Sequence, residues 1–207
     1  MNKLIAVFEE LLMCKSTGEV DKLLERHNID KKFHFPEKNY PKLTFKILPE
    51  EIITLKEKGI LSEDNSLKDT THFTTTEKLL YALVWKNGDL QKLKHIINGI
   101  LADADNDIAE AVVFNQFGRY LSGRVHEPII DQHVLRAFGV YMYRTDVLAV
   151  ERYRRMTIVT KNEGDLIKRY KHWISNELDT SLMAQQEYNV HVDKILFGLG
   201  RYIKLKP

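Results

Sequence analysis

Residues 74–100 read TTTEKLLYALVWKNGDLQKLKHIINGI, and this stretch indicates the fold class. Thr74 and Glu77 have the spacing of a capping box, in which each side chain accepts from the other residue's backbone N–H at a helix start. Leucine and isoleucine then recur every three or four residues, the period of an amphipathic helix. Gly88 stands where the first helix should end, and Asp89 begins the next one. The stretch therefore predicts two consecutive helices.

The same period continues on both sides of this stretch. Toward the C-terminus it predicts five more helices, at residues 106–121 (capped by Asn106), 129–138, 146–156, 165–178 and 181–203. Toward the N-terminus it predicts helices at residues 4–12 and 17–26, and one that begins at Pro49.

Between these helices the N-terminal part of the chain is irregular. Residues 30–48 contain prolines and alternate like a strand only at 43–48, and residues 62–72 form a polar surface loop. We therefore predict an all-α fold of two helical lobes, with at most a minor hairpin near residues 43–48. The expected domains are an N-terminal extension at 1–73 and a helical core at 74–207.

Composition limits the class of protein. The 207 residues are 43% hydrophobic, which is enough chain to bury a core. Cys14 is the only cysteine, so an intramolecular disulfide and a four-cysteine metal site are excluded, and a reducing, cytoplasmic compartment is favoured. Glu9 and Glu10 interrupt the apolar N-terminus, and no later apolar run is long enough to cross a bilayer. The chain is therefore expected to be a soluble cytoplasmic protein with no membrane contact.

The distribution of charge is uneven although the net charge is only +2. Nine of the ten arginines lie at or beyond Arg119, and residues 118–171 hold eleven Lys or Arg against six Asp or Glu. An arginine-rich half is compatible with a DNA-binding face, because the guanidinium group suits bidentate phosphate contacts. The alternative is a solvated surface on which these charges pair with each other.

Two stretches carry a resemblance to a known family. Residues 110–139 read EAVVFNQFGRYLSGRVHEPIIDQHVLRAFG, and residues 189–203 read NVHVDKILFGLGRYI. The first is similar to the segment of helix-hairpin-helix (HhH-GPD) DNA glycosylases in which a Gly/Pro-containing loop leads to an aspartate and then to a helix. The residues that match are Gly123, Pro128, Ile130, Asp131, His133, Val134 and Arg136. The second is similar to the last core helix of the endonuclease III branch, which ends in Gly-Arg-Tyr, here Gly200, Arg201 and Tyr202.

The chain also departs from the pattern of that family. Where the family has a glycine-rich hairpin that grips a phosphate, residues 101–109 read LADADNDIA, with no glycine and three aspartates. The lysine of the bifunctional members and the iron–sulfur cysteines of some members are both missing. The resemblance therefore implies a degenerate hairpin and a monofunctional enzyme, which releases a base without cutting the strand and needs no cofactor.

The resemblance assigns the catalytic carboxylate to Asp131. A carboxylate near C1′ stabilises the positive charge that builds on the sugar as the base leaves, and it orients the attacking water. Its place at a helix start equally fits a plain N-cap aspartate. His133 is a candidate substrate-binding residue, although a packed histidine fits as well. No metal site is expected, because Asp131 and His133 have no evident third ligand.

The remaining candidate residues would bind the flipped base and the DNA backbone. Trp85, Tyr81 and Phe117 are candidate walls of the base pocket, with core packing as the alternative. Arg119 and Arg124 flank the aspartate loop and are candidate phosphate contacts. Arg136 either braces Asp131 or reaches a phosphate. The cluster at residues 152–155 could bind DNA or pair with acids such as Glu151.

Three readings of the function follow. The first is a monomeric DNA glycosylase that flips a damaged or modified base out of duplex DNA, in DNA repair or in phage defence. The second is a non-catalytic DNA- or protein-binding protein on a degenerate glycosylase scaffold, which the glycine-free segment at 101–109 favours. The third is an unrelated helical protein in which Asp131 merely caps a helix.

Overall fold

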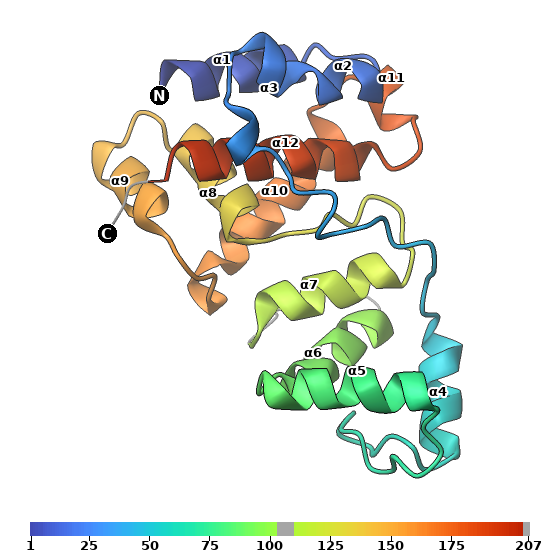
Figure 1. Ribbon diagram of the computed structural model, residues 1–207. Helices are drawn as coiled ribbons and strands as arrows, with labels where there is room; N and C mark the ends of the chain where they lie inside the picture. Colours follow the sequence, from blue (N-terminus) through green and yellow to red (C-terminus); the bar gives the residue numbers. More distant parts are fainter. Residues whose placement is uncertain (103–109, 205–207) are drawn as a thin grey trace. The chain divides into compact units, whose positions relative to one another are not determined.

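A computed structural model describes residues 1–102 and 110–204. The chain divides into two compact units: unit 1 comprises Met1–Lys42 and His126–Pro207, and unit 2 comprises Leu43–Val125. In Figure 1 the blue N-terminal helices and the red C-terminal helix lie together in unit 1. This division differs from the boundary expected after residue 73, because residues 1–42 share a core with the C-terminal helices.

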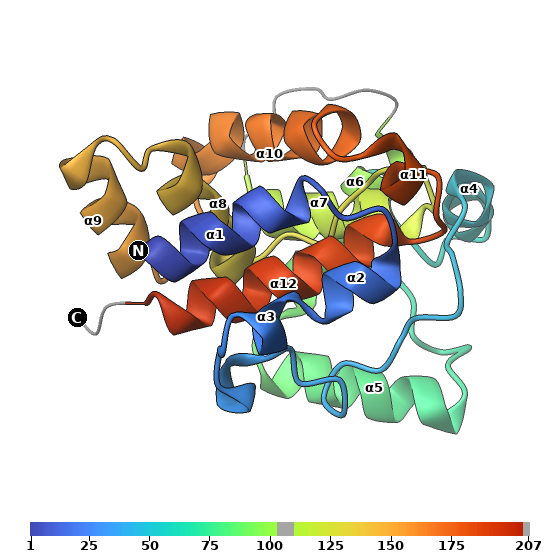
Figure 2. The same ribbon diagram turned by 90° about the horizontal axis from the view of Figure 1, so that it is seen from above.

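Unit 1 is centred on α12 (Tyr188–Tyr202), which lies beside α8 (Gln132–Met142) in Figure 2. Both helices are largely buried, and α8 has an unbroken buried run from Val134 to Val140. The other helical elements of unit 1 are α1 (Asn2–Leu11), α2 (Thr17–Asp21), α3 (Leu23–Arg26), η1 (Lys31–Phe33), α9 (Val147–Arg155), η2 (Lys161–Glu163), α10 (Gly164–Asn176) and α11 (Thr180–Met183).

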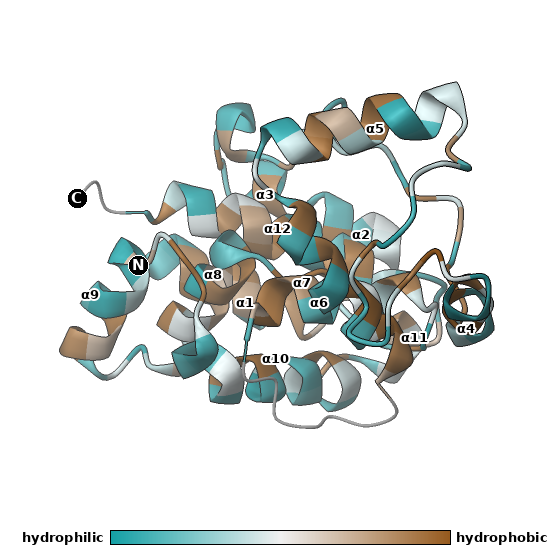
Figure 3. Cartoon of the chain, turned by 90° about the horizontal axis from the view of Figure 1, so that it is seen from below, coloured by the Kyte–Doolittle hydropathy of each residue, from teal (hydrophilic) through white to brown (hydrophobic). Residues whose placement is uncertain are grey.

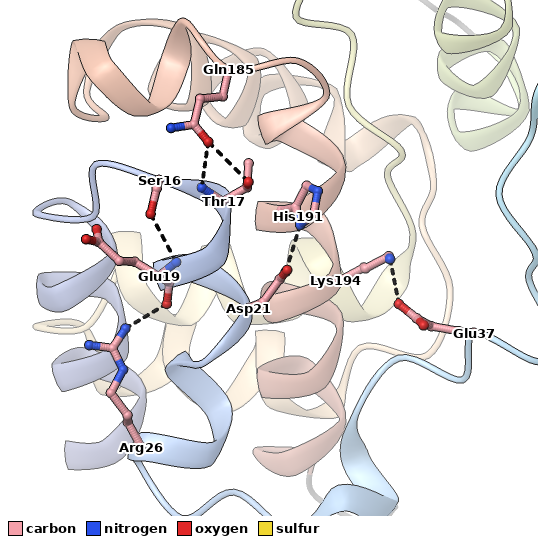
Figure 4. A network of polar contacts seen from close by, with 9 residues as sticks. All are labelled: Ser16, Thr17, Glu19, Asp21, Arg26, Glu37, Gln185, His191 and Lys194. Carbon is pink, nitrogen blue, oxygen red and sulfur yellow. Dashed lines mark hydrogen bonds and ion pairs between the residues drawn. The ribbon is translucent and has the colours of Figure 1, made fainter.

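The N-terminal helices belong to the core of unit 1. The predicted amphipathic helix at the N-terminus is confirmed, since the side chains of Leu4, Phe8 and Leu11 on α1 are fully buried. Polar contacts tie the following segment to Gln185, between α11 and α12, and to α12 itself (Figure 4). The bonded pairs are Thr17 N with Gln185 Oε1 (2.9 Å), Asp21 Oδ1 with His191 Nδ1 (2.7 Å) and Glu37 Oε1 with Lys194 Nζ (2.7 Å).

Unit 2 contains α4 (Pro49–Glu57), α5 (Thr75–Lys86), α6 (Leu90–Leu101) and α7 (Val112–Leu121). Two glycines let α6 and α7 cross closely. A Cβ on Gly99 would lie 1.9 Å from the carbonyl oxygen of Asn115, and a Cβ on Gly118 would lie 2.0 Å from that of Ile96. The buried core beside this crossing consists of Ile52, Leu61, Ile97, Ile100 and Leu121.

The described residues form an all-α structure without a β-strand. The strand expected near residues 43–48 is not formed: the segment is extended, and Ile47 N donates to Leu121 O (3.0 Å) instead of to a partner strand. A single antiparallel bridge joins Leu61 and Leu67. The expected start of a helix at Asn106 lies outside the described residues. Across the described ranges, every helix is too short or too polar to cross a membrane.

Helix α5 contains an unbroken run of largely apolar residues at 79–85, and its ribbon is partly brown in Figure 3. None of its residues is buried. The predicted capping box of Thr74 and Glu77 is confirmed. Leu79 is 68% exposed, Leu83 59% and Trp85 63%. Propensity and capping therefore account for this helix better than burial does.

We expect Leu83→Gln to change the free energy of unfolding by less than about 0.5 kcal/mol, because both residues are good helix formers and the side chain is exposed. Ile97→Ala, on the buried face of α6, should instead cost about 2–4 kcal/mol. Urea unfolding of both variants measures the difference. A cost for Leu83→Gln equal to that for Ile97→Ala would show that α5 is buried in solution.

Candidate functional site

Asp131 is the N-cap of α8. Its Oδ1 atom accepts from His133 N (2.7 Å) and Val134 N (2.8 Å), so the capping interpretation is confirmed. Its Oδ2 atom makes no hydrogen bond with any part of the chain that the structure describes. Burial raises the pKa of this carboxyl, and the two backbone N–H donors and Arg136 partly oppose that shift. One oxygen therefore fixes the side chain, while the other remains open to a ligand.

The loop before Asp131 is anchored to α10 and α12. His126 Nδ1 bonds Tyr188 Oη (2.8 Å), and Asn189 Nδ2 donates to Glu127 O (2.7 Å). Lys171 Nζ lies 3.0 Å from a carboxylate oxygen of Glu127. Contacts from two helices thus hold the loop through side chains and backbone. This anchoring fixes where Asp131 enters α8.

Asp193 on α12 is a second carboxyl group close to the loop. Its Oδ2 accepts from Ile129 N (2.6 Å), and its Oδ1 accepts from Tyr170 Oη (2.5 Å). It is only 5% exposed, and burial raises its pKa to about 8, with the nearby charge of Asp131 acting in the same direction. Burial therefore favours the uncharged form of Asp193, and its bond from Ile129 N anchors the loop two residues before Asp131.

Arg136 lies in the first half of α8, and its side chain is fully buried. Its Nη1 donates to His133 Nδ1 (2.7 Å) and to Gly200 O (2.9 Å), and its Nη2 donates to Met156 O. The expected contact of Arg136 with a DNA phosphate does not fit this geometry, because both terminal nitrogens are enclosed and already bonded. The contacts support a structural role for Arg136, through its bonds to His133, Gly200 and Met156.

His133 lies between Arg136 and the ring of Phe197, whose centroid is 4.8 Å away in an edge-on arrangement. Burial lowers the pKa of His133 to about 4, with further lowering by the charges of Arg136, Arg201 and Lys204. The imidazole is therefore uncharged at neutral pH. Asp131, His133 and Arg136 are the sequence-predicted site residues that the structure brings together.

The five other candidate residues belong to unit 2. Tyr81 and Trp85 lie on α5, where the Tyr81 ring meets Phe73 edge-on (5.8 Å) and Trp85 is mostly exposed. Phe117 on α7 stacks on Tyr120 (6.2 Å) and packs against the core of unit 2. These positions leave the base-pocket assignment an untested prediction.

The two arginines of unit 2 differ in exposure. Arg119 is 2% exposed and its Nε donates to Asn115 Oδ1 (3.4 Å), so the expected phosphate contact does not fit its position. Arg124 is half-buried and its Nη2 donates to Ile100 O (3.2 Å). The burial of Arg119 could not be deduced from its sequence position beside a loop.

The arginine cluster on α9 is engaged within unit 1. Arg155 pairs with Glu151 (2.6 Å), Arg152 pairs with Glu163 (3.0 Å), and Arg154 Nε donates to Ile203 O (2.9 Å). The pairing alternative considered for this cluster is therefore confirmed for Glu151. Among the described residues, no group of three or more His, Cys, Asp or Glu could hold a metal ion.

Sequence reasoning missed Asp193, Tyr170 and Asn189. A signal for Asp193 was present, because it is an acidic residue within the apolar repeat of residues 188–203. Tyr170 and Asn189 gave no comparable signal, since an aromatic or amide side chain on a helix is usually explained by packing or by solvent.

No protein-family model matches the chain, and it has no significant match among curated proteins or among solved structures. The resemblance to the helix-hairpin-helix glycosylases therefore rests on the residues of the two quoted stretches. The function has to be argued from the geometry around Asp131.

Proposed function

We propose that the protein is a monofunctional DNA glycosylase, which hydrolyses the N-glycosidic bond of a damaged or modified base flipped out of duplex DNA. The observation that carries the proposal is the different bonding of the two carboxylate oxygens of Asp131. Its Oδ1 is held by two backbone N–H groups of α8, while its Oδ2 has no partner among the described residues. A carboxylate of fixed direction with one open oxygen suits a role in catalysis.

Asp131 would act on the sugar and on the attacking water. As the bond between C1′ and the base breaks, its electron pair leaves with the base and positive charge develops on the sugar ring. The ionised carboxylate stabilises that charge and accepts a proton from water as the water oxygen bonds to C1′. The raised pKa of Asp131 makes it a better base than an exposed aspartate. The departing base takes a proton from solvent, and Asp131 then loses its own proton to solvent.

The alternative proposal is a non-catalytic DNA- or protein-binding protein on the same scaffold. Two observations favour it: the glycine-free segment at 101–109, and the N-cap bonds of Asp131, which alone would explain an aspartate at that position. The DNA partner is suggested by the resemblance of the two quoted stretches to helix-hairpin-helix glycosylases. DNA repair and phage defence are both compatible roles.

We expect Asp131→Asn to lower base release by about 10²–10⁴-fold, the usual contribution of a positioned acid or base. Asparagine caps helices as well as aspartate does, so the stability of α8 should change little. The measurement is abasic-site formation, revealed by alkali, in duplex oligonucleotides that carry uracil, oxidised, alkylated or hydroxymethylated bases.

Asp146→Asn is the matched control. Asp146 caps α9 in the same way, through Oδ1 bonds from Leu148 N and Ala149 N, yet it lies at the other end of α8 from Asp131. Its base release should equal that of the wild type. Release that persists in Asp131→Asn would show that Asp131 is not the catalytic carboxylate. Salt-sensitive DNA binding without release from any substrate would support the non-catalytic alternative.

A further inference from the structure

The bond between Arg136 and His133 fixes the protonation of the imidazole. Arg136 Nη1 lies 2.7 Å from His133 Nδ1. A guanidinium group has N–H donors and no acceptor, and it remains charged at all ordinary pH values. His133 Nδ1 must therefore be the acceptor. A neutral imidazole with an unprotonated Nδ1 carries its proton on Nε2.

The arginine that makes this bond cannot easily turn away. Its side chain is fully buried, and carbonyl oxygens of two other segments, Gly200 on α12 and Met156 after α9, accept from its terminal nitrogens. The direction of the N–H group that faces His133 is thus set by α12 and by the end of α9. Nε2 of His133 makes no hydrogen bond with the residues in the described ranges.

The charges that face His133 come from three places. Arg136 lies on its own helix, Arg201 on α12, and Lys204 follows α12. Asp131 also contacts His133, but its Oδ1 atom accepts from the backbone N–H group of His133 and not from the imidazole. Among the residues that the structure describes, the ring therefore has cationic neighbours and no carboxylate partner. Burial acts in the same direction as the cations by lowering the imidazole pKa.

We infer that Arg136 is a positioning residue, which holds His133 as an uncharged imidazole with its proton on Nε2 and so presents a neutral hydrogen-bond donor on α8, two residues after Asp131. The use of this donor rests on the proposed function. A positive charge two residues from Asp131 would offset part of the negative charge available to the sugar. A neutral donor can bind an oxygen or nitrogen acceptor of the DNA while leaving that charge intact.

The first test is ¹⁵N NMR of the imidazole groups in the wild-type full chain, with His133→Gln used to identify the His133 signals. We expect the Nε2–H form and no protonation of His133 above about pH 5, given its pKa of about 4. His191 is an internal control of opposite type, because its Nδ1 faces the carboxylate of Asp21 and must carry a proton. An Nδ1–H form of His133, or its protonation near pH 6.5, would overturn the inference.

The second test compares two substitutions of Arg136. Arg136→Met removes the charge and the donors from a side chain of similar length, so the His133 pKa should move from about 4 toward 6.5 and both tautomers should be populated. Arg136→Lys keeps a charge and a donor and should restore the Nε2–H form. The wild-type spectrum decides the protonation of His133 even if Arg136→Met does not fold.

The role beside Asp131 is tested by the pH dependence of base release. We expect the wild type and Arg136→Lys to show no change attributable to His133 between pH 5 and 7, and Arg136→Met to gain a fall toward low pH in that range. An altered His133 spectrum with an unaltered pH profile would refute the positioning role. Absence of base release in every variant, with the expected spectra, would count against the proposed function and leave the assignment of the imidazole intact.

Discussion

Gly200→Ala should destabilise unit 1 by about 3 kcal/mol, the upper part of the range for overpacked sites. A Cβ on Gly200 would lie 1.9 Å from the carbonyl oxygen of His133 and 2.6 Å from its carbonyl carbon. These are backbone atoms of α8, so no side-chain rotation can relieve the clash, and α8 and α12 would have to separate. The same movement would lengthen the bond from Arg136 to Gly200 O. Denaturant unfolding measures the loss.

Gly164→Ala is the control for the intrinsic effect of removing a glycine. Gly164 is the first residue of α10, it has a helical backbone conformation, and its Cβ would meet nothing within 4 Å. Alanine there should leave stability unchanged or raise it by up to about 1 kcal/mol, since glycine is the poorer helix former. Equal effects at Gly200 and Gly164 would show that α8 and α12 do not approach each other this closely in solution.

The Gly-Arg-Tyr motif identified Gly200 in the sequence, but only the structure shows why a glycine is needed there. The period of three to four residues predicted the final helix, and the position of Asp131 after a loop predicted its N-cap. The partner of Gly200 could not be predicted, because the helix period shows which face is buried and does not show what covers it. For the same reason the N-terminal segment was assigned to an extension, although it packs against α12.

Arg136 and Arg119 were both predicted to contact a phosphate, and both are buried. The cause of this difference is similar. Arg119 precedes the loop that leads to Asp131 and Arg136 follows it, and a solvent-exposed side chain is the usual expectation for an arginine. The acceptors that make burial of Arg136 possible are distant in sequence, at Met156 and Gly200. Sequence patterning predicts which residue types could contact DNA, whereas the packing of the helices decides which of them reach the surface.

Helix α5 differs from these arginines, because its apolar side chains are exposed where burial is the usual expectation. The capping box and the run of leucines gave the correct helix, but apolar residues on every side normally indicate a helix enclosed by others. The exposure of Leu79, Leu83 and Trp85 departs from that rule. The identity of a local element was thus predictable from propensity, while its burial was not.

We expect the stability of the protein to fall by about 1–2 kcal/mol between pH 6.5 and 8, and we expect Asp193 to be the main cause of this fall. The pKa of Asp193 is about 8 in the folded protein and about 3.9 in an unfolded chain. Between these values the folded state holds a proton that the unfolded state has lost. Stability linked to Asp193 is therefore fully present below about pH 4 and declines as the pH rises to about 8.

His133 has the opposite effect at lower pH. Its folded pKa is about 4 and its ordinary value is 6.5, so between these values the unfolded state binds the extra proton and stability rises with pH. The two slopes are each about 1.4 kcal/mol per pH unit and largely cancel from pH 4 to 6.5. Above pH 6.5 the rise due to His133 is nearly complete while the decline due to Asp193 continues, so Asp193 is tested in the window from 6.5 to 8.

Asp193→Asn removes the titrating group while keeping an oxygen that can accept from Ile129 N or from Tyr170 Oη. The variant should have a flat profile from pH 6.5 to 8, measured as the free energy of unfolding in urea at several pH values. Asp179→Asn is the control: Asp179 is an exposed cap of α11 whose pKa is lowered by its hydrogen bonds, so the wild-type slope should persist. A flat wild-type profile would mean that Asp193 is ionised when buried. The proton on this carboxyl keeps a second negative charge away from Asp131, so the same result would also remove the reason for treating Asp131 as the sole carboxylate of the site.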